Sequence, residues 1–505
     1  MTTLPAFEAF AEAYAAGAPQ VVYTRLIDDL ETPVSAYLKI GRGRPHAFLF
    51  ESVEGGAWRG RYSIITMEPE LIWRCRGDQA EICEGEDLTS GTYRPDGPAL
   101  ASLKDLIRRS RLTLPDDVPP MAAGVFGALG YDMVRLVEQL PNRNPDRMGL
   151  PDAIMTRPSI VAVFDSIAQE IVLVTAVRPS DVPARQAYDA AVARLGRIAA
   201  ELREPLEPRA DPKPWSPDPM QTPVSRADYA VIVEKAKTYI RAGDIFQVVP
   251  SHRMRTKFEL DTFAFYRALR RLNPSPFMYY LNFGDFQLAG SSPEIMVRLR
   301  DGKITIRPIA GTRPRGKTPA EDLRLEQELL ADPKERAEHL MLLDLGRNDV
   351  GRVAGTAPSG LNAARPPAVR VTESFKIERY SHVMHIVSNV EGDAPQDVDP
   401  VDVLMAALPA GTLSGAPKVR AMEIIDELEI EKRGIAYAGA AGYISSDGAV
   451  DTCILFRTAM FKDGMMYVQA GGGIVADSDP DAEYDETLHK SRALFRAAEE
   501  AWRFA

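Results

Sequence analysis

Three Asp-Gly pairs in the second half of the chain constrain its fold more than any other feature. The pairs Asp301-Gly302, Asp447-Gly448 and Asp463-Gly464 each lie between runs of apolar or β-branched residues. An Asp-Gly pair tolerates the positive φ angles of a two-residue β-hairpin turn, so it is a strong local signal for adjacent antiparallel strands. Three such hairpins predict an antiparallel sheet in this half.

Helical patterns are segregated around the predicted hairpins, which indicates the α+β class. Ser225 is a plausible N-cap for a helix that is followed by a strand at residues 245–249. The helices predicted after residue 224 cover residues 225–242, 320–330, 334–345, 418–429 and 481–501. The first half is mixed, with strands predicted at residues 47–50, 71–74 and 160–163 and helices at residues 103–112 and 187–202.

A proline-rich segment divides the chain. Residues 204–224 read EPLEPRADPKPWSPDPMQTPV, and their prolines remove amide donors and keep the backbone extended. We therefore expect an N-terminal region at residues 1–203, a linker at residues 204–224 and a second domain at residues 225–505. Neither an internal repeat nor a low-complexity tract is present.

Composition and charge exclude several classes of protein. Of 505 residues, 45% are hydrophobic and 26% charged, and no long uncharged apolar run or secretory segment occurs. A net charge of −11 disfavours nucleic-acid and anionic-membrane partners, which need a basic field. Cys75, Cys83 and Cys453 are too few for a disulfide framework. These features predict a cytoplasmic protein with no nucleic-acid or membrane partner.

The segment PIAGTRPRGKT, which begins at Pro308, fits the phosphate-loop pattern G-x-x-x-x-G-K-[ST]. A phosphate loop follows a parallel strand and opens directly into a helix. Here Pro319 pushes Thr318 out of the α region, so Thr318 is better interpreted as an N-cap, and Pro314 removes an amide from the cradle. The context therefore disfavours a nucleoside triphosphatase.

Two pairs of glutamates have helical spacing. Glu335 and Glu338 are three residues apart, and Glu483 and Glu486 repeat this spacing after a helix start at Asp479-Pro480. Converging pairs of carboxylates suit Mg²⁺, which prefers oxygen ligands and retains water. Equally, the pairs fit solvated helix charges. A di-iron site is disfavoured because that chemistry uses Glu-x-x-His, whereas the third residue after Glu335 and after Glu483 is Glu.

Other features are weaker signals for an anionic ligand. The glycines of residues 469–475 (QAGGGIV) and the loop at residues 409–418 (PAGTLSGAPK) offer backbone amides, or merely permit close packing. Arg457 lies in an apolar strand and needs an anionic partner, either a substrate or an internal carboxylate. His382 and His385 are ordinary packed histidines or carriers of a proton.

An ordered set of motifs resembles the anthranilate synthase large-subunit family over nearly all of the chain after the linker. FLFESVEGGAWRGRYSIIT, in the first half, is similar to the regulatory segment of that family. The motifs of the second half are PIAGTRPRG, EHLMLLDLGRNDVGRV, SHVMHIVSNVEG, PAGTLSGAPKVRAMEII, GYISSDGAVDTCILFRTA and QAGGGIVADSDP.

The resemblance implies a fold of antiparallel sheets in an α/β/β/α sandwich, and a site for chorismate. It places Mg²⁺ between Glu338 and Glu486, with Glu335 and Glu483 holding its water ligands. The implied substrate-binding residues are Gly311 and Thr312 at the ring, Tyr437 and Arg457 at the enolpyruvyl carboxylate, the amides of Gly471, Gly472 and Gly473, and Lys490 as a further cation.

The resemblance also implies a reaction. Ammonia adds at C2 of chorismate, the C4 hydroxyl leaves, and elimination of pyruvate aromatises the ring. Hydroxide is a poor leaving group, so Glu294, which matches the general acid of the family, must protonate it, and this requires burial to raise the pKa of the carboxyl. His385 and Thr412 match residues that line the reacting ring, and we expect His385 to support proton transfer.

Two positions discriminate among relatives of this family. Many aminodeoxychorismate synthases carry a nucleophilic lysine where this chain has Ala310, so alanine favours direct addition of ammonia. Isochorismate and salicylate synthases carry a basic lysine at the position of Gln247, and a neutral amide does not activate water. The remaining alternatives are an aminodeoxychorismate synthase component I and a nonenzymatic regulator that retains the pocket.

The resemblance further implies feedback inhibition and a partner. L-tryptophan would be held by Glu51 and Ser52 with Pro276, Phe277 and Met278 around the indole, although core packing also explains these residues. No cysteine-centred glutaminase motif is present. We therefore expect a separate glutamine amidotransferase subunit in a heterotetramer, and use of free ammonia by the chain alone.

Overall fold

The computed structural model describes residues 2–52, 60–141, 144–206, 213–354, 368–380 and 383–505. Two large antiparallel sheets diverge from one long pair of strands, β4 (Tyr62–Arg76) and β8 (Ala153–Asp165). The register of this pair shifts between Pro69 and Leu71. Such a bulge bends a strand pair and increases its twist, which allows one end of each strand to enter each sheet.

The first sheet runs, by its pairing, through β1 (Thr3–Leu4), β2 (Gln20–Ile27), β9 (Glu170–Val177), β8, β4, β3 (Phe48–Glu51), β12 (Phe277–Asn282), β13 (Gln287–Ser292), β22 (Thr458–Lys462), β23 (Met465–Gly471) and β11 (Ser251–Lys257). Its central connection is the β3–β12 pair, in which Glu51 lies opposite Met278. That pair joins a strand before the linker to a strand after it.

The second sheet runs through β6 (Arg94–Gly97), β5 (Gln79–Glu84), β4, β8, β7 (Gly124–Leu129), β20 (Ala440–Ser445), β21 (Val450–Ile454), β14 (Ile295–Arg300), β15 (Lys303–Ile306) and β18 (Val383–Asp393). On β18, β16 (Ile309–Pro314) pairs on the same side as β15, and β17 (Val369–Arg379) on the other. The β7–β20 pair again joins the two parts of the chain.

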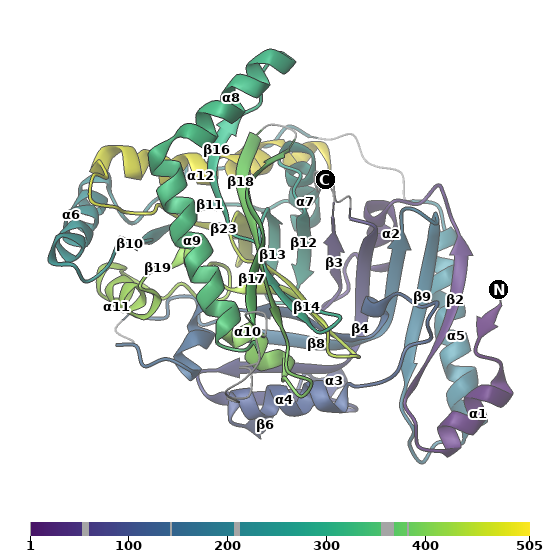
Figure 1. Ribbon diagram of the computed structural model, residues 1–505. Coiled ribbons are helices and arrows are strands. Elements are labelled where there is room, and N and C mark those ends of the chain that lie inside the picture. Colours follow the sequence, from purple (N-terminus) through teal and green to yellow (C-terminus); the bar gives the residue numbers. More distant parts are fainter. Residues whose placement is uncertain (1, 53–59, 142–143, 207–212, 355–367, 381–382) are drawn as a thin grey trace, which may run out of the picture.

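Helices cover the outer faces of both sheets (Figure 1). One apolar core lies between the sheets, because its members come from both. A second core joins the first sheet to α1 (Phe7–Ala15), α2 (Pro33–Ile40), α5 (Ala184–Arg203), α7 (Thr262–Leu272) and α12 (Pro480–Glu500). A third joins the second sheet to α4 (Ala99–Arg109), α9 (Pro333–Gly351) and α10 (Pro400–Ala407). The α+β class and the α/β/β/α sandwich are therefore confirmed.

The remaining elements are short or peripheral. α6 (Arg226–Ala242) and α11 (Lys418–Leu428) share a small core beside the strand pair β10 (Gln247–Val248) and β19 (Gly415–Ala416). α8 (Pro319–Ala331) projects from the top of the molecule in Figure 1. The short helices are α3 (Asp87–Ser90) and the 3₁₀ turns η1 (Pro120–Ala122), η2 (Tyr131–Leu136), η3 (Gly411–Leu413) and η4 (Ala501–Arg503).

The predicted hairpins and caps are confirmed. The Asp-Gly pairs connect β14 to β15, β20 to β21 and β22 to β23, and Asp301, Gly302, Asp463 and Gly464 all have positive φ. The Ser225 side chain accepts a hydrogen bond from Asp228 N at the start of α6. The strand predicted at residues 245–249 is shorter than expected, since only Gln247–Val248 pair.

The phosphate-loop pattern does not form a phosphate loop. Gly311 belongs to β16, which pairs antiparallel with β18, and Thr318 accepts a hydrogen bond from Glu321 N as the N-cap of α8. The alternative of a nucleoside triphosphatase is therefore wrong on both structural requirements. Within the described residues, no helix has the length and apolar character needed to cross a lipid bilayer.

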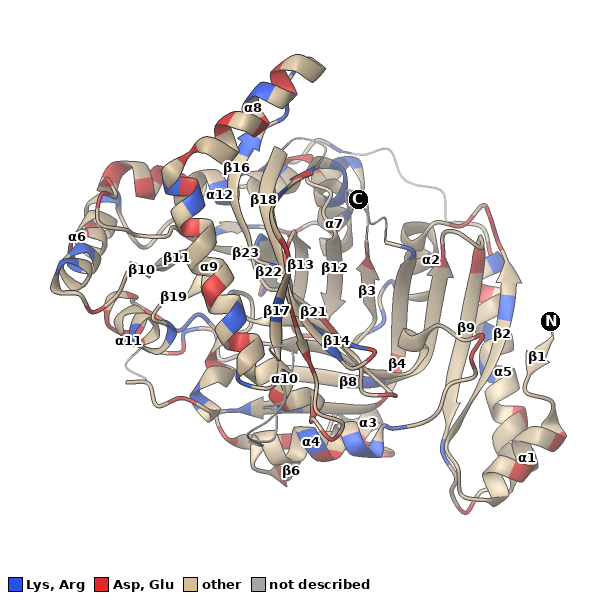
Figure 2. Cartoon of the chain, in the orientation of Figure 1, with Lys and Arg blue, Asp and Glu red and all other residues tan. Residues whose placement is uncertain are grey.

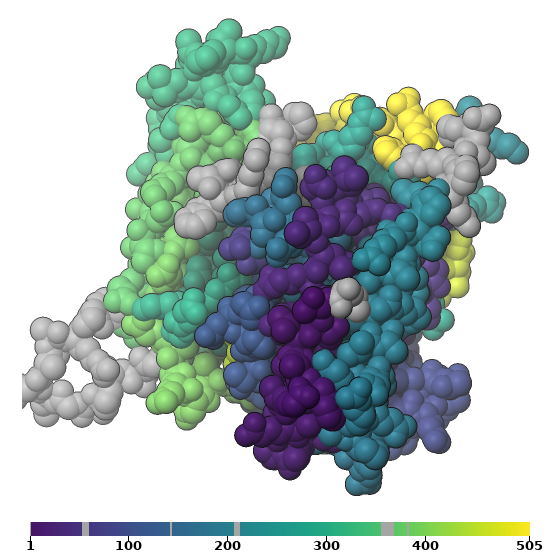
Figure 3. All heavy atoms as spheres, turned by 90° about the vertical axis from the view of Figure 1, so that its right-hand side faces the viewer, coloured from purple at the N-terminus to yellow at the C-terminus, as the bar shows by residue number. Residues whose placement is uncertain are grey.

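In Figure 1, α1, α2 and α5 lie on the right-hand side, which faces the viewer in Figure 3, whereas α3, α4 and β6 lie at the bottom. Residues 213–224 of the predicted linker contain no helix or strand, and only Gln221 bridges to Arg255. The strand pairs β3–β12 and β7–β20 nevertheless build the N-terminal residues into both sheets. The predicted boundaries at residues 203 and 225 thus divide the sequence into two segments, but strands from both segments pair within the same two sheets.

Candidate active site

Glu294 lies in the short connection between β13 and β14 and is only 5% exposed. The Thr412 hydroxyl, in η3, donates a hydrogen bond of 2.9 Å to its Oε1 atom. Burial raises the pKa of Glu294 to about 8, and the hydrogen bonds from Thr412 and the Ile309 backbone and the charge of Arg457 offset part of this effect. The carboxyl is therefore largely protonated at neutral pH, as a general acid requires.

His385 lies on β18 directly opposite Thr312 of β16. Its Nδ1 atom is 3.0 Å from the carbonyl oxygen of Gly311 and 3.1 Å from the Thr312 hydroxyl. A carbonyl oxygen only accepts, so Nδ1 carries the proton and Nε2 carries the lone pair. Burial lowers the pKa of His385 to about 4, so the ring is neutral and serves as a hydrogen-bond acceptor rather than a cationic acid.

Arg457 follows β21 and has a positive φ of 50°. Its positive charge lowers the pKa of both Glu294 and His385, so the three side chains lie close to one another. Burial is the main cause that lowers the pKa of the guanidinium, which nonetheless remains cationic. Among the described residues it has no ion-pair partner within 4.0 Å, so the expected alternative of an internal salt bridge is not found there.

Tyr437 is fully buried, and the Arg433 guanidinium lies 5.3 Å from the centre of its ring. Arg433 pairs with Glu429 at 2.6 Å and donates to the carbonyl oxygens of Leu413 and Val249. This buried ion pair thus joins the segment after α11 to the segments that contain Leu413 and Val249. Sequence reasoning missed it, because both residues lie beyond the end of α11 and no helical spacing relates them.

The predicted metal-binding glutamates come from the first turns of α9 and α12 (Figure 2). Glu338 is half-buried, Glu483 is buried and Glu486 is exposed, so only part of the set is freely solvated. Glu335 and Glu486 act on Glu338, and Glu486 acts on Glu483, in each case raising the pKa in addition to the larger effect of burial. The structure therefore brings the two pairs near one another.

These glutamates do not form a ready coordination shell. Within the described part of the chain, no three His, Cys, Asp or Glu side chains are grouped closely enough to hold a metal ion. Two of the carboxylates are paired with protein cations instead, Glu335 with Arg313 at 2.9 Å and Glu486 with Lys490 at 2.8 Å. Glu483 Oε2 is buried without a hydrogen-bond partner among those residues. The repulsion among these carboxylates and the unpaired Glu483 Oε2 atom fit a site that binds a hydrated cation.

The predicted glycines lie against these acids. A Cβ atom on Gly472 would lie 2.8 Å from Glu483 Oε2, and one on Gly311 would lie 3.0 Å from Glu335 Oε2. Lys490 reaches across to the carbonyl oxygen of Gly471 at 3.0 Å. The backbone at these two glycines therefore lies close to the carboxylates of both acidic helices.

Gly473 lies against Gln247, since a Cβ there would lie 2.3 Å from Gln247 Nε2. Gln247 is 3% exposed, and its Oε1 atom has no hydrogen-bond partner among the described residues. An unpaired buried acceptor is costly unless a ligand supplies a donor. Gln247 therefore offers one hydrogen-bond acceptor beside the glycine segment.

The predicted tryptophan-binding residues meet at the β3–β12 pair. Glu51 lies opposite Met278, with Phe277 and Pro276 just before it, and Ser52 is half-buried after β3. The Glu51 carboxylate is already bound by Tyr266 and, at 3.0 Å, by Arg270. The Met278 side chain belongs to the core beneath α7. His382 and residues 53–59 of the similar motif lie outside the described residues.

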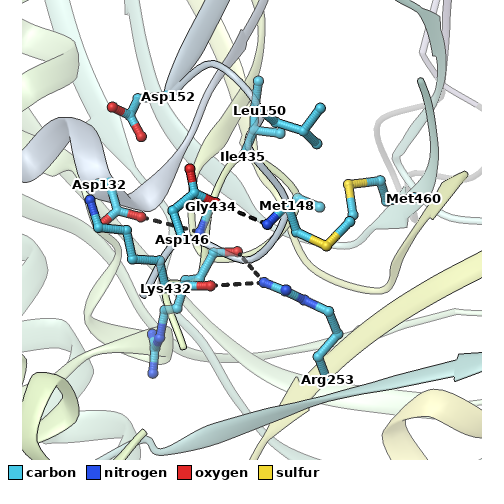
Figure 4. A pocket seen from close by; sticks show the side chains of 12 residues that line it. Asp132, Asp146, Met148, Leu150, Asp152, Arg253, Lys432, Gly434, Ile435 and Met460 are labelled. Carbon is cyan, nitrogen blue, oxygen red and sulfur yellow. Dashed lines mark hydrogen bonds between the residues drawn. The ribbon is translucent and has the colours of Figure 1, made fainter. Parts of the chain in front are cut away.

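A separate small cavity lies between residues 132–152 and the segment after α11 (Figure 4). Arg253 crosses it to donate to the carbonyl oxygen of Lys432, and Asp132 accepts from Gly434 N. None of the predicted site residues lines this cavity. It is a polar junction between the two parts of the chain and is not the site built around Glu294.

Comparison with known proteins identifies the family. A sequence model of the family described as chorismate binding enzyme matches residues 49–496. The chain is 54% identical over 505 residues to anthranilate synthase component 1 of Cereibacter sphaeroides, with 99% of each sequence covered. The chain belongs to the anthranilate synthase component I family. Membership in this family confirms the resemblance predicted from the motifs.

Solved structures agree with the family assignment. Anthranilate synthase component I from Streptococcus pneumoniae TIGR4 has a TM-score of 0.74 at 34% identity, covering 93% of this chain and 99% of that chain. The menaquinone-specific isochorismate synthase from Escherichia coli has a TM-score of 0.70 at 18% identity, covering 98% of both chains. The second likeness shows that the anthranilate synthase fold is shared with enzymes of distant sequence.

Proposed function

We propose that this member of the anthranilate synthase component I family converts chorismate and ammonia to anthranilate, pyruvate and water. The observation that carries the proposal is the buried, protonated carboxyl of Glu294, which is held by Thr412 within range of the Arg457 cation. An acid beside a cation that has no ion-pair partner among the described residues suits a substrate that has both a hydroxyl leaving group and a carboxylate.

Binding of chorismate uses two cations, backbone amides and the residues beside His385. Arg457, with Tyr437 nearby, receives the enolpyruvyl carboxylate, and a charge-assisted contact of this kind contributes about 1.5 to 3 kcal/mol. The amides of residues 471–473 and Lys490 supply further donors. Gly311 and Thr312 line the ring beside His385. These local donors overcome the unfavourable net charge of −11.

We assign Mg²⁺ to Glu338 and Glu486, with Glu335 and Glu483 holding its water ligands. When bound, the ion supplies positive charge that neutralises the ring carboxylate of chorismate. Arg313 and Lys490 pair with Glu335 and Glu486 in the structure, so these two carboxylates would have to exchange a protein cation for the ion or its water ligands. The protein cations thus lower the repulsion among the acids before the substrate arrives.

Ammonia attacks C2 of chorismate, and Glu294 donates its proton to the departing C4 hydroxyl, which leaves as water. The added nitrogen loses one proton, and elimination of pyruvate with loss of the C2 proton then aromatises the ring. The Nε2 lone pair of His385 accepts a hydrogen bond at the ring during these steps. The Thr412 hydroxyl keeps the Glu294 carboxyl oriented.

Two residues favour the ortho-amino product. Ala310 is buried on β16 and offers no nucleophile, in contrast to the lysine of aminodeoxychorismate synthases. The Gln247 Oε1 atom can accept a hydrogen bond from ammonia but cannot deprotonate water, which disfavours hydration of the ring. An aminodeoxychorismate synthase component I remains the alternative.

Regulation and partners follow from the same assignment. We assign L-tryptophan as a feedback inhibitor to Glu51, Ser52, Pro276, Phe277 and Met278, within an N-terminal regulatory region at residues 1–203 joined to a catalytic domain at residues 225–505. The name component 1 of the relatives supports a second component. We propose that this component is a glutamine amidotransferase, in a cytoplasmic heterotetramer.

Incubation of the purified chain with chorismate, Mg²⁺ and ammonium tests the proposal. Fluorescent anthranilate with equimolar pyruvate is the expected product. Accumulation of aminodeoxychorismate would instead establish the alternative enzyme, and binding of chorismate without turnover would establish a nonenzymatic regulator. Omission of Mg²⁺ and addition of a chelator are the controls for the metal.

A further inference from the structure

The loop that carries Thr412 is held in place by a buried lysine. Lys418 is the first residue of α11, and its Nζ atom donates to Asp349 Oδ1 of α9 at 2.6 Å and to the carbonyl oxygen of Ala407 at 3.5 Å. The Lys418 and Asp349 side chains are 9% and 5% exposed. Since Ala407 ends α10, one ammonium group ties both ends of residues 407–418 to α9.

The middle of the same loop also packs on α9. A Cβ atom on Gly411 would lie 2.7 Å from Leu345 Cδ1 and 3.3 Å from Leu345 Cβ, so a larger residue there would force Leu345 to shift. Leu345 and Asp349 are one helical turn apart and therefore share a face of α9. The position of Thr412 relative to α9, which also carries Glu335 and Glu338, is thus set by a packing contact and an ion pair.

A small cavity lies behind the acid. It has a volume of about 20 Å³, which accommodates a single water molecule. Both Glu294 and Asp349 line it, and Thr412 and Gly411 form part of its wall. Apolar side chains from α9 and β14 complete the lining. If the loop moved away from α9, this cavity would open and Glu294 would become hydrated.

We propose that the Asp349–Lys418 ion pair is a positioning device for the general acid: it fixes the Thr412 loop to α9 and keeps the cavity behind Glu294 small. The inference rests on the proposed function, because it assumes that Glu294 protonates the leaving hydroxyl. Asp349 and Lys418 touch neither the substrate nor the metal, so they act through Thr412.

The groups that face Glu294 determine how its pKa changes when the Thr412 loop moves. They are the Thr412 hydroxyl, the Arg457 cation and Tyr380, with Asp349 across the cavity. Loss of the Thr412 hydrogen bond alone would raise the pKa of Glu294, whereas entry of water would remove the larger effect of burial and lower it. Opening of the cavity therefore predicts a net fall in the pKa of the acid.

The test compares the wild-type chain with Asp349→Leu/Lys418→Met, in which apolar residues of similar size replace the pair without leaving a buried charge. Asp349→Asn is the milder companion. The matched control is Glu31→Leu/Lys39→Met, because Lys39 also pairs with a carboxylate and a backbone carbonyl, here of Leu202, in the N-terminal part of the chain. Ammonia-dependent anthranilate formation is measured from pH 6 to 10, together with thermal unfolding.

We expect both Asp349 variants to lose about tenfold or more in kcat with little change in KM for chorismate. The alkaline fall of kcat should move to lower pH by about one unit, and the control should match the wild type. A folded Asp349 variant with wild-type kcat and pH profile would overturn the proposal. So would unfolding of both Asp349 variants while the control folds, since the pair would then serve stability alone. Absence of turnover in the wild type would instead reject the proposed function.

Discussion

The Thr412 hydroxyl donates its hydrogen bond to one oxygen of Glu294, Oε1, at 2.9 Å. The Ile309 backbone forms a second hydrogen bond with the same carboxyl. The two residues come from segments more than a hundred positions apart, and each belongs to a different wall of the site. Thr412 therefore orients the carboxyl.

Replacement of Glu294 tests this arrangement most directly. We expect Glu294→Gln to lower kcat by about a hundredfold or more, the contribution typical of a general acid, while chorismate still binds. Calorimetric titration with chorismate and fluorescence of anthranilate measure the two effects. Thr412→Val, which keeps the shape of the side chain, should show a smaller loss. Near-normal turnover in Glu294→Gln would remove this residue from the mechanism.

The pH dependence of kcat follows from the pKa of Glu294. The acid is active when protonated, so kcat should hold below about pH 8 and fall as the pH rises through that value. The same group should make the fold less stable with rising pH between 4.5 and about 8, because the unfolded chain releases this proton first. Urea unfolding at several pH values, with Glu294→Gln as the reference, measures that slope. An equal slope in both proteins would contradict the prediction.

Gln247 should control which nucleophile adds to the ring. In Gln247→Lys we expect the formation of anthranilate to fall by about tenfold. An isomer of chorismate with its hydroxyl at C2 should appear, because the lysine amine can activate water to attack that carbon. Chromatography of the products with and without ammonium makes the measurement. Gln247→Met is the control, which should lose rate without gaining the new product. The same product profile in the lysine variant and the wild type would count against this role.

Ser52 lies where the proposed tryptophan site begins. A bulky Ser52→Phe side chain should fill the space for the indole, so inhibition by L-tryptophan should weaken by about tenfold or more while ammonia-dependent activity persists. Dose-response curves for tryptophan measure the change. Ser90→Phe, at an exposed position on α3, is the matched control. Unchanged sensitivity in Ser52→Phe would place the inhibitor elsewhere.

The buried pair of Arg433 and Glu429 should be important for stability. Arg433→Met leaves the Glu429 carboxylate, whose side chain is 2% exposed, without its cation. We expect the free energy of unfolding to fall by about 3 to 5 kcal/mol. Denaturant unfolding should show recovery in Arg433→Met/Glu429→Leu, where no charge is left unpaired. A loss below about 1 kcal/mol in the single variant would show that Glu429 finds another partner.

Local signals predicted much of the fold. The Asp-Gly turns, the Ser225 and Thr318 caps and the helical periods of α9 and α12 depend on residues close in sequence, and the structure contains them all. The pairing of β3 with β12 depends on contacts more than two hundred residues apart, for which the sequence carries no short-range signal. The division into sandwich layers was therefore known only through the family resemblance.

Site residues were predictable from the sequence where their function requires a regular spacing along a helix. Glu335 and Glu338, three residues apart on a helix, indicated a shared face, but not that Arg313 would pair with one of them. Asp349 and Arg433 are buried, and this could not be predicted from the sequence, because Asp and Arg side chains are usually exposed. The unpaired Oε1 atom of Gln247 likewise arises from its packing on Gly473, a contact across two segments.

The strand pairs that cross between the N-terminal part and the rest of the chain limit how such proteins can be altered. Because β3 pairs with β12 and β7 pairs with β20, cutting away the first two hundred residues would expose the edges of two central sheets. The N-terminal part therefore cannot be deleted, or transferred to another protein, as an independent unit. Variants with weaker inhibition by L-tryptophan should be sought by changing individual side chains along the β3–β12 and β7–β20 pairs.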